Sequence, residues 1–212
     1  MIRLYTYWRS STAYRVRIGL NLKGLAWEPV AVDLSRIANR EPAYLEVNPQ
    51  GLVPALQIDG MLLAQSLPIL EYLEERWPEP PLLPRDPAQR VRARALASIV
   101  ACDIHPLNNA RVLRYIKDEL GLAQPRRDAW YAHWIEEGLR AFDAWLEPDS
   151  GASFCCGDAP TLADLCLVPQ LYNARRFGCA LDPYPRLLRI EEACLALPAF
   201  ADAAPDMQPD RF

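Results

Sequence analysis

The chain of 212 residues has few glycines, few histidines and no long apolar run. Nine glycines stand against twenty prolines, which indicates many fixed stops and few flexible linkers. No apolar run reaches the roughly 18 residues that a transmembrane helix needs. The start, MIRLYTYWR, has neither the continuous apolar core nor the cleavage site of a signal peptide. We therefore expect a protein that does not enter a membrane and stays in the cytoplasm.

Metal ligands are also scarce. His105 and His133 are the two histidines and lie far apart, and the six cysteines show no C-x-x-C spacing. We expect no metal site, and reduced, mostly buried thiols. The net charge of −4 argues against nucleic acid or an anionic membrane as the main partner. Hydrophobic residues at 51% and charged residues at 24% are typical of a folded globular protein, which excludes disorder as the main state.

Strand and helix patterns alternate in the first part of the chain. Residues 2–7 are rich in β-branched and aromatic side chains, which predicts a strand. Ala13, Val16 and Leu20 then recur at helical spacing, and residues 27–32 predict a second strand. A strand, a helix and a strand in this order predict a βαβ unit with parallel strands.

A hairpin and a further helix follow. The apolar runs 53–58 and 61–63 flank Asp59-Gly60, which is the signature of a type I′ turn. Ser66 is then expected to be the N-cap of a helix.

Beyond a cluster of prolines, every pattern is helical. Asp86 is expected to cap one helix, Pro106 to break it, and Thr161–Asp164 to form a capping box. The sequence therefore predicts an α/β domain over 1–80, a proline-rich linker over 81–88 and an all-α domain over 89–212.

Three segments at the ends of the small sheet carry candidate ligand groups. Ser10, Ser11 and Thr12 start the first helix, where they either cap it or hold an anion such as a thiolate, because hydroxyl donors and a helix N-terminus lower a thiol pKa. Val53-Pro54 is either a plain strand start or a cis-proline that exposes the Val53 backbone. Gln65-Ser66 opens a helix and suits a carboxylate. Together they suit a peptide-like ligand with a thiol and a carboxylate.

The helical part offers fewer signals. His105 and Asn109 lie at the expected helix break, either as a solvated, capped turn or as polar groups that face the α/β domain across an interdomain cleft. Arg175 and Arg176, near the end of a helix, either complement its dipole or, together with Arg9, supply the fork-shaped donors that a dicarboxylate substrate needs.

Several motifs resemble the zeta class of glutathione transferases, which includes maleylacetoacetate and maleylpyruvate isomerases. They are RSSTAYRVRI at 9–18, NPQ at 48–50, VP at 53–54, QS at 65–66, CDIHPLNN at 102–109 and TLAD at 161–164. The resemblance covers nearly the whole chain. It implies a thioredoxin-like domain that binds glutathione, a helical domain that helps to hold the second substrate, and a homodimer.

The resemblance also implies roles for single residues. Glutathione would be held by Ser10, Ser11, Arg15, Asn39, Val53, Gln65, Ser66, His105 and Asn109. The catalytic group would be Arg9, Ser10, Ser11 and Thr12, and the substrate carboxylates would meet Arg9, Arg175 and Arg176. Many zeta proteins have a cysteine where this chain has Thr12, so which of the three hydroxyls serves the thiolate is left open.

The expected function is the glutathione-dependent cis–trans isomerisation of a maleyl-type keto acid. Two alternatives stay open: a glutathione transferase that conjugates or dehalogenates small electrophiles, and a non-catalytic binding protein on the same fold.

Overall fold

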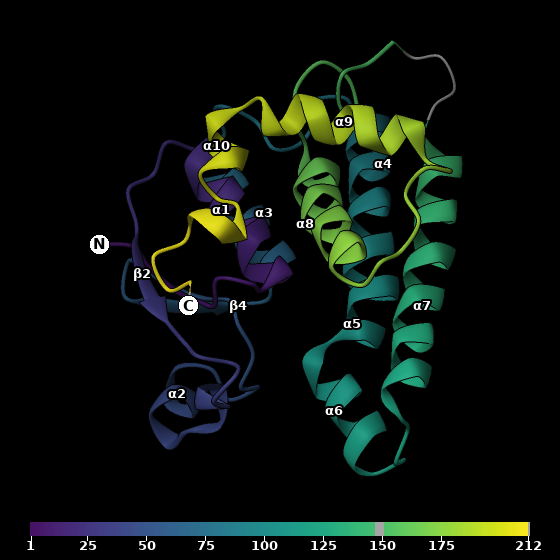
Figure 1. The fold of residues 1–212 in the computed structure, drawn as a ribbon. Coiled ribbons are helices and arrows are strands. Elements are labelled where there is room, and N and C mark those ends of the chain that lie inside the picture. Colours follow the sequence, from purple (N-terminus) through teal and green to yellow (C-terminus); the bar gives the residue numbers. More distant parts are fainter. Residues whose placement is uncertain (147–150, 212) are drawn as a thin grey trace. The chain divides into compact units, whose positions relative to one another are not determined.

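A computed structural model describes residues 1–146 and 151–211 of the chain (Figure 1). The chain divides into two compact units. Unit 1 contains Met1–Leu82 together with the chain from Leu195 onward, and unit 2 contains Leu83–Cys194. In the described part of the chain, no helix is both long and apolar enough to cross a membrane.

Unit 1 is built on a mixed four-stranded sheet of order β2-β1-β3-β4. Strands β1 and β2 are parallel, and β3 is antiparallel to both β1 and β4. The predicted βαβ unit and hairpin are therefore confirmed. The elements before the first unit boundary are β1 (Arg3–Thr6), α1 (Ser11–Leu22), β2 (Glu28–Ala31), the 3-10 helix η1 (Ala38–Arg40), α2 (Pro42–Val47), β3 (Ala55–Ile58), β4 (Met61–Ala64) and α3 (Ser66–Arg76).

Local chemistry explains the turns of this sheet. Asp59 and Gly60 both have positive φ, 50° and 79°, as a type I′ turn between β3 and β4 requires. Helix α3 begins at Ser66 itself, and Gln65 is its N-cap. The predicted cap was thus wrong by one residue, and the Gln65 side chain makes no capping bond.

The strand register brings three chain segments to one edge of the sheet. Tyr5 of β1 lies opposite Ala55 of β3, and Ala55 lies opposite Ala64 of β4. Because β3 runs antiparallel to both neighbours, the C-terminal ends of β1 and β4 meet the N-terminal end of β3. The segments that carry the hydroxyl cluster, Val53 and Ser66 therefore all lie at this edge, as the sequence led us to expect.

Helix α1 is buried on nearly all sides, from Ser11 to Leu20 except at Thr12. Part of its cover comes from α10 (Pro198–Ala201), which lies beside α1 in Figure 1, and from the chain up to the 3-10 helix η3 (Pro205–Met207). The Tyr14 hydroxyl, for example, donates to the Phe200 carbonyl at 3.2 Å. The sequence pattern predicts these last elements as part of the helical domain, whereas in the structure they belong to unit 1.

Unit 2 is helical, as expected. Its elements are α4 (Pro87–Ser98), the π-helix η2 (Ile99–Ile104), α5 (His105–Asn108), α6 (Ala110–Asp118), α7 (Gln124–Trp145), α8 (Leu162–Arg176) and α9 (Pro185–Leu195), the last of which ends at the unit boundary. The caps are confirmed: the Asp86 carboxylate accepts from the Gln89 N–H at 2.9 Å, and Thr161 and Asp164 form the capping box of α8. Helix α5 begins at His105 directly after the π-helix, and Pro106 is its second residue.

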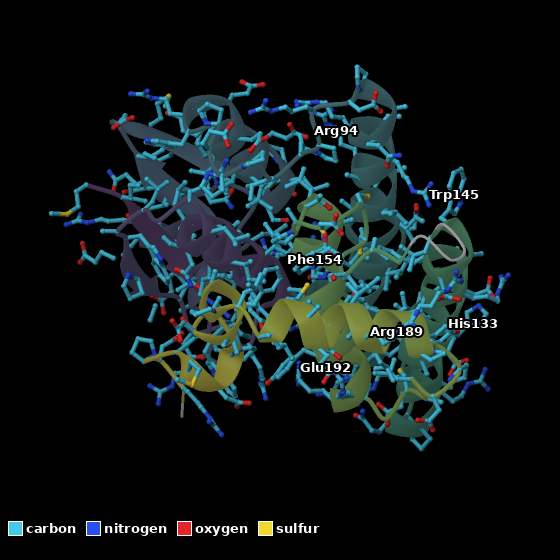
Figure 2. All side chains as sticks on the ribbon, turned by 90° about the horizontal axis from the view of Figure 1, so that it is seen from above. Arg94, His133, Trp145, Phe154, Arg189 and Glu192 are labelled. Atoms are coloured by element: carbon cyan, nitrogen blue, oxygen red, sulfur yellow. The ribbon has the colours of Figure 1, made fainter. Side chains whose placement is uncertain are left out.

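The described residues contain no cluster of three or more histidine, cysteine, aspartate or glutamate side chains that could hold a metal ion. His133 is exposed on α7 (Figure 2), whereas His105 begins α5. All six cysteines are free thiols.

Candidate functional site

The start of α1 carries a chain of hydroxyl groups. Ser10 is the N-cap, and its Oγ accepts from the Ala13 N–H at 3.2 Å. The Thr12 hydroxyl donates to the Val53 carbonyl at 3.0 Å, and the Ser10 and Thr12 oxygens are 2.9 Å apart. A hydroxyl has one hydrogen to give. Because Thr12 gives its hydrogen to Val53, Ser10 is the donor in the pair with Thr12.

The three hydroxyls differ in access. Ser11 is only 6% exposed, whereas Ser10 and Thr12 are half-buried. A ligand at this edge of the sheet therefore reaches Ser10 or Thr12 more easily than Ser11.

The Val53–Pro54 peptide bond is cis. The Val53 carbonyl accepts the Thr12 hydroxyl, while the Val53 N–H has no hydrogen-bond acceptor among residues 1–146 and 151–211. The backbone at this point thus keeps a donor for an extended ligand.

The residues between β4 and α3 combine strain with a helix N-terminus. Gln65 has φ 70° and ψ 124°, a sparsely populated conformation for a residue with a side chain, of a kind that gathers at ligand clamps. Its side-chain amide donates to Gln50 Oε1 at 2.8 Å. Ser66, 6% exposed, is the first residue of α3, where free backbone N–H groups and the helix dipole favour an anion.

A buried guanidinium stands next to Ser66. Arg15 of α1 is 1% exposed, and its Nη1 donates to Ser66 Oγ at 3.2 Å. Its Nε and Nη2 atoms are buried without a hydrogen-bond partner in the described part of the chain. Because Ser66 accepts from Arg15, its own hydrogen is left to donate to a ligand. The charge of Arg15 therefore lies next to Ser66 and is shielded from solvent.

Two further predicted residues make contacts within unit 1. Asn39 Nδ2 donates to the Gly51 carbonyl at 2.7 Å, which ties η1 to the turn before β3. Arg9 Nη2 donates to the Tyr7 hydroxyl at 3.3 Å, and its guanidinium lies 5.0 Å from the centre of the Trp8 ring. Both side chains are half-buried, so each leaves part of its surface to solvent or a ligand.

In unit 2, His105 and Asn109 are brought together. The Asn109 Oδ1 atom accepts from the Arg111 N–H at 3.0 Å and caps α6. Its Nδ2 atom is 3.4 Å from His105 Nε2, which makes this ring nitrogen the acceptor.

The two arginines at the end of α8 have different partners. Arg175 forms a two-pronged ion pair with the buried Glu191 of α9, which raises the pKa of the guanidinium. Arg176 is exposed; it contacts Asn173 Oδ1 at 3.4 Å and lies over the Phe177 ring. The charge of Arg175 is therefore already balanced by a carboxylate.

Sequence reasoning from the residues alone did not single out Arg15. Between the apolar residues of α1, Arg15 looks like an ordinary solvated side chain, and only the resemblance implies that it binds a ligand. The structure shows that α1 is buried on nearly all sides, so that Arg15 is a buried charge.

Comparison with known proteins places the chain among glutathione transferases. Residues 4–81 match the glutathione S-transferase N-terminal domain, and residues 128–193 match the C-terminal domain. The maleylacetoacetate isomerase of Pseudomonas aeruginosa is 51% identical over 212 residues, which cover 99% of this chain and 98% of that protein.

Solved structures agree. A holo structure of maleylpyruvate isomerase, described as a bacterial zeta-class glutathione S-transferase, superposes with a TM-score of 0.97 at 47% identity, over 99% of this chain and 100% of that one. Maleylacetoacetate isomerase from Anaeromyxobacter dehalogenans, solved with glutathione in its active site, gives 0.89 at 50% identity, over 99% and 97%. The chain therefore belongs to the zeta-class glutathione transferase family, in the group of the maleylacetoacetate and maleylpyruvate isomerases.

Proposed function

We propose that this chain is a glutathione-dependent isomerase that converts a maleyl-type keto acid into its trans, fumaryl product. The observation that carries the proposal is the meeting of three segments at one edge of the sheet of unit 1. One offers hydroxyls, one a backbone N–H without an acceptor in the described part of the chain, and one the N-terminus of α3, next to the buried guanidinium of Arg15 from α1. These groups match the thiol, the peptide and the carboxylate of glutathione in turn.

The charge at Ser66 supports the carboxylate end of this match. An isolated buried charge is costly unless a partner offsets it. The γ-glutamyl carboxylate of glutathione would accept from the Ser66 hydroxyl and the first N–H groups of α3, and would offset the charge of Arg15. The Val53 N–H would pair with the cysteinyl carbonyl, and Gln65 would contact the γ-glutamyl end.

Ser10 is our candidate for the donor to the thiolate. Its hydrogen goes to Thr12 in the free protein, and the bond is between neutral groups. A hydrogen bond to a charged acceptor contributes about 1.5–3 kcal/mol, against about 0.5–1.5 kcal/mol for a neutral one. Turning the Ser10 hydrogen from Thr12 to a thiolate is therefore favourable, and the N-terminus of α1 adds to the effect.

When held by the groups around Ser10, Val53 and Ser66, glutathione would supply a nucleophilic thiolate for reversible addition to the cis double bond, and it would be regenerated rather than consumed. The role of the chain is to keep the thiol ionised and to orient the keto acid. Arg9 would hold a substrate carboxylate and offset the negative charge that develops on the keto oxygen. Arg176 fits a second carboxylate better than Arg175, whose charge Glu191 already balances.

The remaining residues are proposed contacts of lesser weight. His105 and Asn109 would add polar contacts to glutathione from the helical unit, and Asn39 would contact its glycine end. A homodimer in the cytoplasm completes the proposal. Exposed apolar side chains on the edge strand β4, Met61 and Leu62, are compatible with a protein partner there.

Incubation with glutathione and either maleylacetoacetate or maleylpyruvate tests the function. Absorbance reports the fumaryl product, and a thiol assay reports glutathione. The proposal predicts product without loss of thiol. Conversion with stoichiometric loss of thiol would instead indicate a conjugating transferase, and binding without conversion of either acid would indicate a non-catalytic protein.

A further inference from the structure

We propose that the C-terminal segment, residues 195–211, is a positioning clamp for the β1–α1 loop, Tyr7–Ser10. This inference rests on the proposed function, because the loop carries Arg9 and ends at Ser10. The segment follows the helical unit in the chain, yet it belongs to unit 1.

The first connection between the clamp and the loop is made by Arg17 of α1, which is 0% exposed. Its Nε donates to the Ala203 carbonyl at 2.9 Å, on the C-terminal segment. Its Nη2 donates to the Trp8 carbonyl at 3.1 Å, and its Nη1 contacts the Tyr7 carbonyl at 3.5 Å and Thr6 Oγ1 at 3.1 Å. One buried guanidinium thus joins the segment to the loop.

The second connection is made by Asp210 of the clamp itself. Its Oδ2 accepts from the Trp8 N–H at 2.9 Å, while its Oδ1 is buried without a hydrogen-bond partner among the described residues. Both backbone polar groups of Trp8 are therefore held from outside the loop, the N–H by Asp210 and the carbonyl by Arg17.

The clamp acts on the functional residues through Tyr7 and Trp8. Arg9 donates to the Tyr7 hydroxyl and lies over the Trp8 ring, so the position of its guanidinium depends on those two side chains. The Ser10 N–H donates to the Tyr7 carbonyl at 2.9 Å. Fixing the Tyr7–Trp8 backbone therefore fixes the start of α1 and the direction of Arg9.

The cost of burying Arg17 couples the β1–α1 loop to the C-terminal segment. A fully buried guanidinium is unfavourable unless its donors are satisfied. The contacts of Arg17 are shared between the loop and the C-terminal segment, so its burial is offset when both are in place. Arg17 and Asp210 are positioning residues, since neither is proposed to contact glutathione or the keto acid.

Asp210→Ala tests the clamp, with Asp210→Asn as the conservative rescue. Asp206→Ala is the matched control, because it removes a carboxylate of the same segment that is paired with Arg211 at the surface. Three quantities are measured: amide exchange of Trp8 in the free protein, the thiol pKa of bound glutathione, and the Kd of S-methylglutathione.

We expect Asp210→Ala to speed exchange of the Trp8 amide, to raise the thiol pKa and to lower turnover about tenfold, since small displacements of catalytic groups are costly. S-methylglutathione should bind within about twofold of the parent, because in the described part of the chain neither Arg17 nor Asp210 bonds to the Ser66 hydroxyl or the Val53 backbone. Asp210→Asn keeps an acceptor and should restore most of the turnover, and Asp206→Ala should match the parent.

Parent-like thiol pKa and turnover in Asp210→Ala, despite faster Trp8 exchange, would overturn the clamp. So would a loss of S-methylglutathione binding as large as the loss of turnover, since that would indicate general damage. Arg17→Lys gives a second route to the same comparison if Asp210→Ala does not fold. A parent protein that binds no glutathione would instead contradict the proposed function.

Discussion

At the scale of single residues, the hydrogen bonds within the protein decide which hydroxyl at the start of α1 can donate to a ligand. Thr12 gives its hydrogen to the Val53 carbonyl, and Ser10 gives its own to Thr12. Ser10 is thus the hydroxyl whose redirection to a thiolate disturbs the backbone least. The sequence located the cluster and left the choice among three hydroxyls open, because rotamers and partners 41 residues away decide it.

We predict that Ser10→Ala raises the thiol pKa of bound glutathione by about 1–2 units, which is the worth of one charge-assisted hydrogen bond. A higher pKa leaves less thiolate at neutral pH, so the rising limb of the pH–rate profile should move to higher pH. Titration of the thiolate absorbance measures the shift. Thr12→Val, which leaves the Ser10 hydrogen free, should shift the pKa less; an equal or larger shift would transfer the role to Thr12.

Arg15 and Arg17 make a matched pair on one helix, both buried but differently partnered. Two guanidinium nitrogens of Arg15 have no hydrogen-bond partner among the described residues, whereas Arg17 donates to carbonyls of the loop and the C-terminal segment. We predict that Arg15→Met leaves the free energy of unfolding unchanged or higher, because it removes an unbalanced buried charge. Arg17→Met should lower it by about 2–4 kcal/mol, because it leaves buried carbonyls unpaired.

The same Arg15→Met variant should bind glutathione about tenfold more weakly, yet lose little affinity for a glutathione analogue whose γ-glutamyl carboxylate is amidated. Denaturant melts and isothermal titration give the two readouts. Equal losses for both ligands would show that Arg15 does not act through the carboxylate.

At the scale of elements, periodicity predicted the strands and helices well, since apolar spacing and caps are local. It did not predict the environment of α1. The apolar positions Ala13, Val16 and Leu20 indicated one buried face, but Arg17 on another face bonds to Ala203, 186 residues along the chain. Contacts at that separation leave no periodic trace, so the clamp and the buried arginines could not be predicted.

The π-helix η2, directly before His105, is packed closely against α7. A Cβ atom on Gly138 would lie 2.1 Å from Ile104 Cγ1 and 2.2 Å from Cδ1. We predict that Gly138→Ala lowers the free energy of unfolding by about 1–3 kcal/mol through overpacking. Adding Ile104→Ala should make the two effects less than additive, because the smaller side chain relieves the clash. Strict additivity in denaturant melts would contradict this packing.

At the scale of the whole molecule, short motifs spread along the chain predicted the fold better than composition and hydrophobic periodicity did. Composition and caps predicted an α/β unit and a helical unit, but only the resemblance joined them into a glutathione transferase. The sequence pattern places the last helices in the helical domain, but in the structure they belong to the α/β unit. Contacts between residues so far apart in the chain leave no periodic pattern in the sequence. Neither the motifs nor the fold predicts which maleyl acid is the substrate, because related proteins of the same fold are named for two different maleyl acids.

The central claim is that the sheet edge of unit 1 favours a sulfur anion. Titrating the absorbance of glutathione bound to the parent protein measures this directly. The account predicts a thiol pKa well below the ordinary cysteine value of about 8.5. A bound thiol that titrates at or above that value would contradict it.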